Sequence, residues 1–243
     1  MNKNEMDKFV KNKYDEYKIK YNIKLPSITD IHYTKNESFW ARFNSPDLYN
    51  RIYILYIDES LLNENKKFIK QILFHEFTHL CDSLDILCKP IEEFKKIMIS
   101  YSEFHASERE MIERLEETNE NSLSLQTEII HVGILTIESF MNQTYNFMCD
   151  DLIKMSNNDD LQSFYYNTSH IYYFYGYIRA LHKFKIDYNF KLIPEFLSEI
   201  SEIQNTLLQD EININKVLSD YITLESEILN KYKNNRLRKF LNF

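Results

Sequence analysis

The residues best suited to chemistry lie in the stretch ILFHEFTHLCDSLD, residues 72–85, where two histidines flank a glutamate. His75 and His79 are four residues apart, so on a helix both imidazoles project from one face and can reach one metal ion. Glu76 then lies beside that ion and is placed to take a proton from a water molecule that the ion activates. The spacing predicts a zinc site with Glu76 as general base.

The same stretch predicts the helix that positions these residues. Apolar residues recur at steps of three and four and form one stripe: Ile69, Leu73, Phe77, Leu80, Leu84 and Leu87. His75 and His79 lie on another face, together with Asp82. We therefore expect a helix over 64–87 that buries one face and presents the histidines on another. A chance HExxH string in an amphipathic helix is the alternative. Asp82 could orient an imidazole N–H, or be an ordinary exposed helical aspartate.

The HEFTH motif follows a segment rich in strand-forming residues, and in this setting it resembles the zincin metallopeptidases over about residues 28–117. The resemblance implies that His75 and His79 bind zinc and that Glu76 is the general base. Within the zincins, the chain is more similar to compact prophage and mobile-element proteins of the ImmA/IrrE type than to secreted peptidases. That resemblance implies a polypeptide substrate in the cytosol, such as a repressor or another regulator.

A catalytic zinc ion usually takes three protein ligands and leaves one position for water. One source for the third ligand is Asp85, six residues after His79. The apolar stripe keeps the helix straight through this point, however, and turns Asp85 about 120° away from His79. We therefore look for the third ligand on the next helix.

The string YSEFHASE, residues 101–108, offers that ligand as Glu103 and resembles the glutamate-bearing helix of gluzincins. In such helices a small residue, here Ala106, allows close packing against the first helix. His105 and Glu108 stay open as alternatives, because the apolar stripe through 94–115 places them near the apolar face and Glu103 almost opposite. A helix buried on both faces would remove this conflict. Glu103 is the predicted ligand.

Around this site the sequence predicts an α+β fold that is mostly α. A helix over 3–21 precedes three strand-like segments, ITDIHYT, ESFWARFN and YNRIYILYID, which predict a small antiparallel sheet packed on the active-site helix. From residue 60 onward we expect only helices, at 64–87, 91–117, 122–156, 159–185, 193–209 and 213–235. The prediction is one domain, 1–243, with a zincin-like core over 1–120 and a helical subdomain over 121–243.

Two further segments have predicted roles. The aromatic strand near Trp40–Phe43 could hold a substrate in an extended conformation. The stretch 170–184 is aromatic on all sides and predicts a buried helix, from which a Tyr or Arg could stabilise an oxyanion. Four histidines without metal spacing have no predicted role: His32, His131, His170 and His182.

Composition narrows the class of protein. The formal net charge is −8, which argues against a nucleic-acid-binding surface, because phosphate contacts need clustered Lys and Arg. Three cysteines without a CxxC pair are typical of free thiols in a reducing cytoplasm. No stretch of about 18 apolar residues occurs, so we expect a cytoplasmic protein that enters no membrane. The alternative to a zinc peptidase is a catalytically inactive zincin-fold regulatory or protein-binding module of a mobile element. The sequence assigns no oligomeric state.

Overall fold

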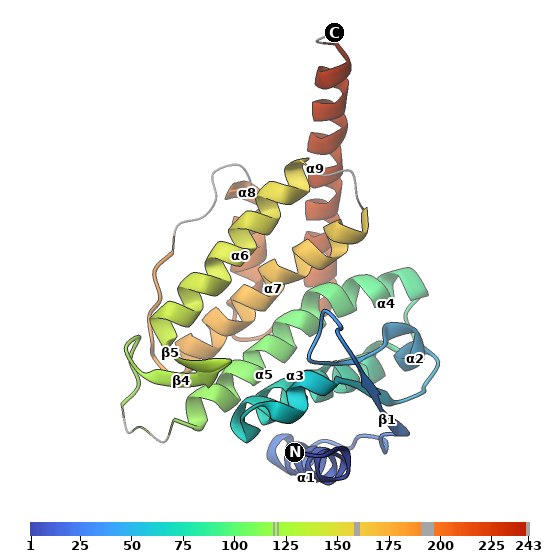
Figure 1. The fold of residues 1–243 in the computed structure, drawn as a ribbon. Helices are drawn as coiled ribbons and strands as arrows, with labels where there is room; N and C mark the ends of the chain where they lie inside the picture. The colour runs from blue at the N-terminus through green and yellow to red at the C-terminus, as the bar shows by residue number, and fades with distance from the viewer. Residues whose placement is uncertain (119, 121, 158–160, 191–196, 242–243) are drawn as a thin grey trace.

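The fold comes from a computed structural model that describes residues 1–118, 120, 122–157, 161–190 and 197–241 (Figure 1). Its first elements are α1 (Lys3–Tyr21), β1 (Asp30–Thr34), β2 (Ala41–Phe43), α2 (Ser45–Tyr49), β3 (Ile54–Asp58), the short 3-10 helix η1 (Glu59–Asn63), α3 (Lys66–Ile86), α4 (Ile91–Ile97), the π-helical turn η2 (Met98–Ser102) and α5 (Glu103–Glu116). The chain continues with β4 (Glu128–His131), β5 (Gly133–Thr136), α6 (Ile137–Asn157), α7 (Leu161–Lys183), α8 (Leu197–Leu207) and α9 (Ile214–Leu241). The predicted α+β, mostly α fold class is confirmed.

The larger sheet has three strands in the order β1-β3-β2. β2 pairs antiparallel with β3, as predicted, but β1 pairs parallel with it, from Asp30 opposite Ile54 to Thr34 opposite Asp58. A parallel pair needs a crossover between its strands, and the segment with β2 and α2 provides it. The sheet is therefore mixed, and β2 is an edge strand that packs beside α3.

Helix α3 carries the HEFTH motif. Asn65 caps its N-terminus by accepting a hydrogen bond from the backbone N–H of Lys67. The predicted apolar stripe is buried as far as Leu80, whereas Leu84 and Leu87 are only partly buried. The rings of Tyr14 and Tyr17 on α1 pack against Phe77. Helix α1 thus covers part of the apolar face of α3, and α5 packs against α3 as well.

The predicted helix over 91–117 is interrupted in its middle. α4 ends at Ile97, the π-helical turn η2 continues to Ser102, and α5 begins at Glu103. A π turn contains one extra residue, which rotates the following helix by about 100° relative to a straight continuation. The apolar stripe counted through 94–115 therefore loses its phase at Glu103, and the side chain of Glu103 faces α3.

Helices α5 and α7 approach each other closely at Gly176. A Cβ added to Gly176 would lie 2.3 Å from the carbonyl oxygen of Phe104 and 2.9 Å from the backbone nitrogen of Glu108. Only glycine allows this approach. Because α3 and α7 both pack on α5, and Ala106 is fully buried, α5 is the doubly covered helix that a ligand at Glu103 requires.

The predicted helix over 122–156 is wrong in its first part. Residues 128–136 form the antiparallel hairpin β4–β5, and α6 begins only at Ile137. Isoleucine and valine favour strands, and Gly133 takes the turn conformation with φ +106°. These local preferences outweigh the helical periodicity that we extended backwards from α6. The last predicted helices correspond to α7, α8 and α9, with residues 159–160 and 193–196 outside the described part of the chain.

Buried apolar residues form two clusters. One joins α1, the sheet, α3, α4 and Leu218 of α9. The other joins α5, the β4–β5 hairpin, α6, α7, α8 and other residues of α9, and the partly buried Tyr101 packs against both. In Figure 1, α6 and α7 run side by side across the molecule, and α9 extends beyond the other helices at its C-terminal end. Within the described residues, no helix is both long and apolar enough to cross a membrane.

Candidate metal centre

Two neighbouring helices bring the predicted ligands together. His75 and His79 come from the middle of α3, and Glu103 is the first residue of α5. One ligand atom from each residue lies within 4.8 Å of the other two. The Nε2 atoms of His75 and His79 are 3.0 Å apart, and each lies 3.6 Å from a carboxylate oxygen of Glu103. These three residues form a group that could hold a metal ion.

The spacing of this group fits zinc. Zinc–ligand bonds of about 2.0–2.2 Å at tetrahedral angles separate the donor atoms by about 3.3–3.6 Å. The 3.6 Å separations from Glu103 agree with this, and the two imidazole nitrogens need to move apart by only a few tenths of an ångström from their 3.0 Å separation. Two imidazoles and one carboxylate are also a donor set that catalytic zinc uses.

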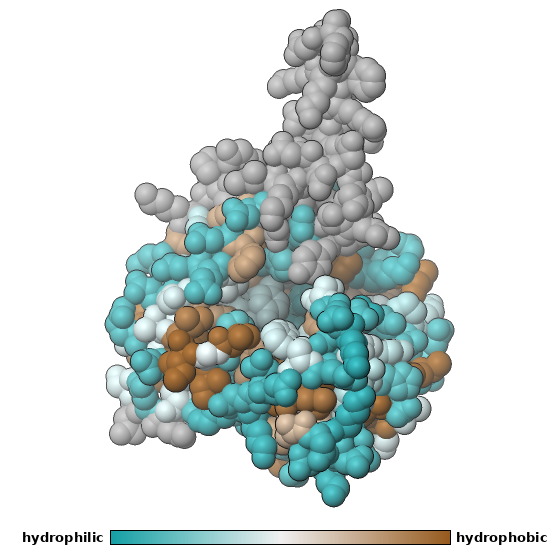
Figure 2. Space-filling model, viewed as in Figure 1, coloured by the Kyte–Doolittle hydropathy of each residue, from teal (hydrophilic) through white to brown (hydrophobic). Residues whose placement is uncertain are grey.

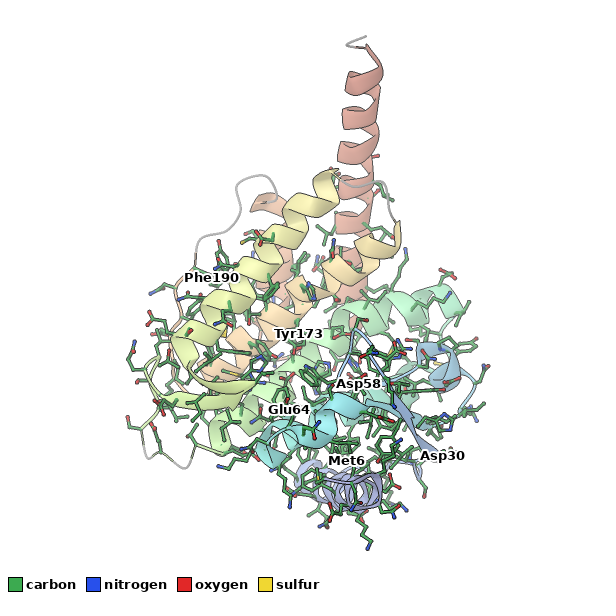
Figure 3. All side chains as sticks on the ribbon, in the orientation of Figure 1. Met6, Asp30, Asp58, Glu64, Tyr173 and Phe190 are labelled. Carbon is green, nitrogen blue, oxygen red and sulfur yellow. The ribbon has the colours of Figure 1, made fainter. Side chains whose placement is uncertain are left out.

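Glu110 orients the first histidine. Its carboxylate accepts a hydrogen bond from Nδ1 of His75 at 3.1 Å, which leaves Nε2 free to face Glu103. Arg114, one turn further along α5, donates to the same carboxylate at 2.6 Å, and the hydroxyl of Tyr173 on α7 donates to it at 2.9 Å. Figure 3 shows Tyr173 near the centre of the molecule. Such carboxylate–histidine pairs fix the tautomer of a metal ligand.

The π-helical turn orients the second histidine. Nδ1 of His79 lies 2.8 Å from Oγ of Ser102, the last residue of η2, so Nε2 of His79 also faces Glu103. Ser102 and Glu103 are adjacent in the chain, and both act on this site only because η2 turns the start of α5 toward α3. Interruptions of this kind are often found at functional sites.

The other predicted ligands lie outside the group. Asp85 is exposed on α3. His105 pairs instead with Asp82, at 2.8 Å between Nδ1 and Oδ1. Asp82 is buried, so the expectation of an exposed aspartate is wrong. It orients His105 and neither of the two ligand histidines.

Glu108, the last of the predicted alternatives, also points away from the metal group. Its carboxylate lies 3.1 Å from Nε of Arg179 and 2.7 Å from Nζ of Lys183, both on α7. These ion pairs link α5 to α7 on the side away from the histidines. Arg179 is thereby also engaged outside the candidate metal centre.

Glu76 lies beside the metal group on the side of the sheet. Its carboxylate accepts a hydrogen bond of 3.0 Å from the backbone N–H of Phe43, at the end of β2. Burial raises the pKa of Glu76 to about 8, although the charge of His75 opposes this rise; the nearby carboxylate of Glu103 adds to it. The edge strand thus fixes Glu76, and burial makes it a stronger base than an ordinary glutamate.

The carboxylates create a local field that favours a cation. Burial alone lowers the pKa of His75, but the hydrogen bonds to Glu103 and Glu110 outweigh it and raise that pKa to about 10. Burial likewise opposes ionisation of Glu110, yet its hydrogen bond with His75 and the charge of Arg114 bring its pKa to about 2. The carboxylates therefore stabilise positive charge on His75, whereas burial lowers the pKa of His79 to about 4.

The metal group opens into a cavity of about 530 Å³. His75, Glu76 and Glu103 form part of its lining, and the segment from Ser38 to Ala41 forms another part. The remaining walls come from residues of the β4–β5 hairpin, α6 and α7. A cavity of this size lies within the usual range for small-ligand sites.

Sequence reasoning missed several residues of this site. His131 and His170, which had no predicted role, both line the cavity. Tyr173 and Tyr177 also line it, and they belong to the helix from which a Tyr or Arg was expected at the site. Glu110, the partner of His75, was also missed. A usable signal existed for Glu110, since it lies seven residues after Glu103 and shares its helix face. For His131 the signal lies in the β-branched residues around Gly133, which favour the hairpin that positions it, whereas we predict a helix there from the sequence.

No protein-family model, curated protein or solved structure matches this chain.

Proposed function

We propose that the chain is a zinc-dependent metallopeptidase that hydrolyses peptide bonds of a polypeptide substrate. The observation that carries the proposal is the convergence of His75, His79 and Glu103, with Glu76 in the same cavity. Two histidines and a glutamate would hold the zinc ion, and a glutamate next to the first histidine supplies a base. Support also comes from Glu110 and Ser102, which orient the two imidazoles.

Each residue of the site has a distinct task in the proposed reaction. When bound, zinc supplies Lewis-acid chemistry that polarises a substrate carbonyl and increases the acidity of water. Glu76 accepts a proton from the attacking water and passes it to the leaving amine. The hydrogen bond from Phe43 holds the Glu76 carboxylate in position for both transfers. Among the described side chains of α7, Tyr173 and Tyr177 are the tyrosines that line this cavity, whereas Arg179 is paired with Glu108.

The open edge of β2 is suited to binding an extended substrate. The backbone oxygen of Trp40 accepts from the N–H of Asp58, so Trp40 faces β3. Backbone groups alternate along a strand, and the N–H of Phe43 points away from β3 toward Glu76. Ala41 lies on the same side as Phe43 and lines the cavity. A substrate strand could add to this edge beside the metal group.

The proposal is tested with zinc-loaded protein, fluorescein-labelled casein as an unfolded substrate, and the variant Glu76→Gln. Wild-type protein should contain one zinc ion per chain by mass spectrometry and should cleave the casein. Glu76→Gln should keep the zinc and lose at least about 100-fold in rate, since it removes the base. Glu92→Gln, at an exposed glutamate of α4, is the matched control and should be fully active.

Casein cleavage that survives Glu76→Gln would contradict the proposed mechanism. Freshly purified protein without zinc, combined with no cleavage after zinc is added, would instead favour the regulatory or protein-binding module. The proposed setting, a cytoplasmic peptidase of a mobile element that acts on a repressor or regulator, follows from the resemblance of the HEFTH segment alone.

A further inference from the structure

The walls of the cavity contain information about the substrate that the metal group does not. Helix α6 presents one stripe to the cavity, because Phe140, Gln143, Thr144 and Phe147 recur at steps of three, one and three. None of these residues contacts the metal group in the described structure. They form a wall that belongs to the C-terminal half of the chain, outside the segment that resembles the zincins.

Aromatic rings make up most of the apolar lining of the cavity. They come from the segment before β2, from α6 and from α7: Phe39, Trp40, Phe140, Phe147, Tyr173 and Tyr177. Ile72 and Ala41 are the aliphatic residues among the described lining. Aromatic pairs prefer edge-to-face or offset contacts and gain free energy beyond the area that they bury. Such a cavity accepts another aromatic ring more favourably than an aliphatic chain of similar size.

The carboxylates that line the cavity already have partners within the protein. Glu110 is paired with Arg114 and His75, Glu103 faces both histidines, and Glu76 accepts from the backbone of Phe43. Among the described residues that line the cavity, none is Lys or Arg. An acidic substrate side chain therefore finds no Lys or Arg with which to pair, and a basic one finds no carboxylate without a partner. Burying either charge here is costly.

An exposed apolar surface lies next to this cavity. Val132 of the β4–β5 hairpin and Phe147 of α6 are exposed by 53% and 66%, and we call these two residues the apolar rim. His131 of the same hairpin lines the cavity, so the hairpin joins rim and cavity. Figure 2 shows hydrophobic residues gathered over β4 and β5, beside the hollow at the centre of this face. A polypeptide that enters the cavity can continue over the rim.

We infer that the cavity selects polypeptide segments with a large uncharged aromatic residue next to the scissile bond, and that Phe140 and Phe147 determine this specificity. The apolar rim contacts the neighbouring apolar residues of the same segment. That the selected residue lies next to a cleaved bond rests on the proposed peptidase function. The selection of an aromatic residue is a binding property. It can therefore be measured without catalysis.

The probes are fluorescein-labelled ten-residue peptides of Ala, Ser and Gly with one varied central residue, titrated against zinc-loaded Glu76→Gln protein by fluorescence anisotropy. Peptides with Phe, Tyr or Trp should bind about three- to tenfold more tightly than the Leu peptide. They should bind about 100-fold more tightly than the Lys or Glu peptides. Phe147→Ser should weaken the binding of the aromatic peptides about fivefold and leave the affinity for the alanine peptide unchanged. Phe147→Trp, which keeps an aromatic ring, should keep the preference for aromatic peptides.

Ile222→Ser is the matched control, because Ile222 is an exposed apolar residue of α9 that does not line the cavity. Its peptide affinities should equal those of the parent protein. Equal affinity for aromatic, leucine and lysine peptides would overturn the inference, and so would a preference that Phe147→Ser leaves intact. Ranked binding without cleavage by wild-type protein would contradict the proposed peptidase function alone, and cleavage without ranking would contradict the specificity alone.

Discussion

Replacing Gly176 by alanine tests the close approach of α5 and α7, on which the position of Glu103 depends. The added Cβ would lie 2.3 Å from the carbonyl oxygen of Phe104, which is 1.1 Å closer than the 3.4 Å at which ordinary contact begins. The obstacle is backbone, so it cannot rotate away. The two helices must separate, or α7 must slide along α5.

The expected cost follows from two opposing terms. Overpacking of a well-packed interior costs about 3 kcal/mol, and alanine regains about 1 kcal/mol of helix propensity over glycine. The net loss is about 2 kcal/mol in the free energy of unfolding. For a chain of this size, that corresponds to a decrease in Tm of about 4–8 °C.

Thermal unfolding followed by circular dichroism measures this change, with Gly133→Ala as control. Gly133 has open space around its Cβ position but a φ of +106°, so its substitution reports backbone strain without a steric clash. Gly176→Ala should also weaken zinc binding. Tyr173 lies on the displaced helix and donates a hydrogen bond to Glu110, the carboxylate that orients His75. A rise in Tm for Gly176→Ala would show that helix propensity alone acts, and would refute the close approach.

Three other outcomes are expected. Glu110→Gln should weaken zinc affinity about 10- to 100-fold in a chelator competition, because it removes the carboxylate that orients His75. Glu116→Gln, on the exposed face of α5, should leave zinc affinity unchanged. Zinc at 100 times its Kd should raise the free energy of unfolding by about 2.7 kcal/mol, an increase that EDTA should abolish; no change would show that the metal group binds no zinc. Burial, with the charge of Arg114, lowers the pKa of His131 to about 4 from its usual 6.5, so the unfolded chain takes up this proton first as pH falls. The stability that neutral His131 contributes is complete above pH 6.5 and is lost by about 1.4 kcal/mol per pH unit toward pH 4; urea titrations at several pH values should show a shallower acid decrease for His131→Phe.

The sequence was most informative where one helix determined the geometry. The HEFTH spacing and the apolar stripe of α3 depend only on residues a few positions apart, so they located His75, His79 and the core face correctly. Glu103 depended on a second helix, and its choice rested on a family resemblance against the count of apolar positions. The structure explains the conflict, because that count assumed a straight helix and η2 adds a residue just before Glu103.

Other parts of the site depend on contacts between distant segments. Glu110 meets His75 across 35 positions of sequence, and Tyr173 meets Glu110 across 63. The spacing of residues within one helix cannot predict which residues of distant segments form such hydrogen bonds. The β4–β5 hairpin differs, since its β-branched residues around Gly133 did carry a local signal. We extended the helical pattern of α6 over it and so lost one wall of the cavity.

The candidate metal centre also lies where the two apolar clusters meet. His75 and His79 stand on α3, whose buried residues belong to the first cluster, while Glu103 precedes Phe104, which belongs to the second. A bound ion would therefore link the segments that form the first apolar cluster to those that form the second. Loss of the ion would leave the two clusters joined by the packing of α3 on α5 and by ion pairs such as that of Lys70 with Glu113. The ion adds to these links, so metal content would contribute to how cooperatively the whole chain melts.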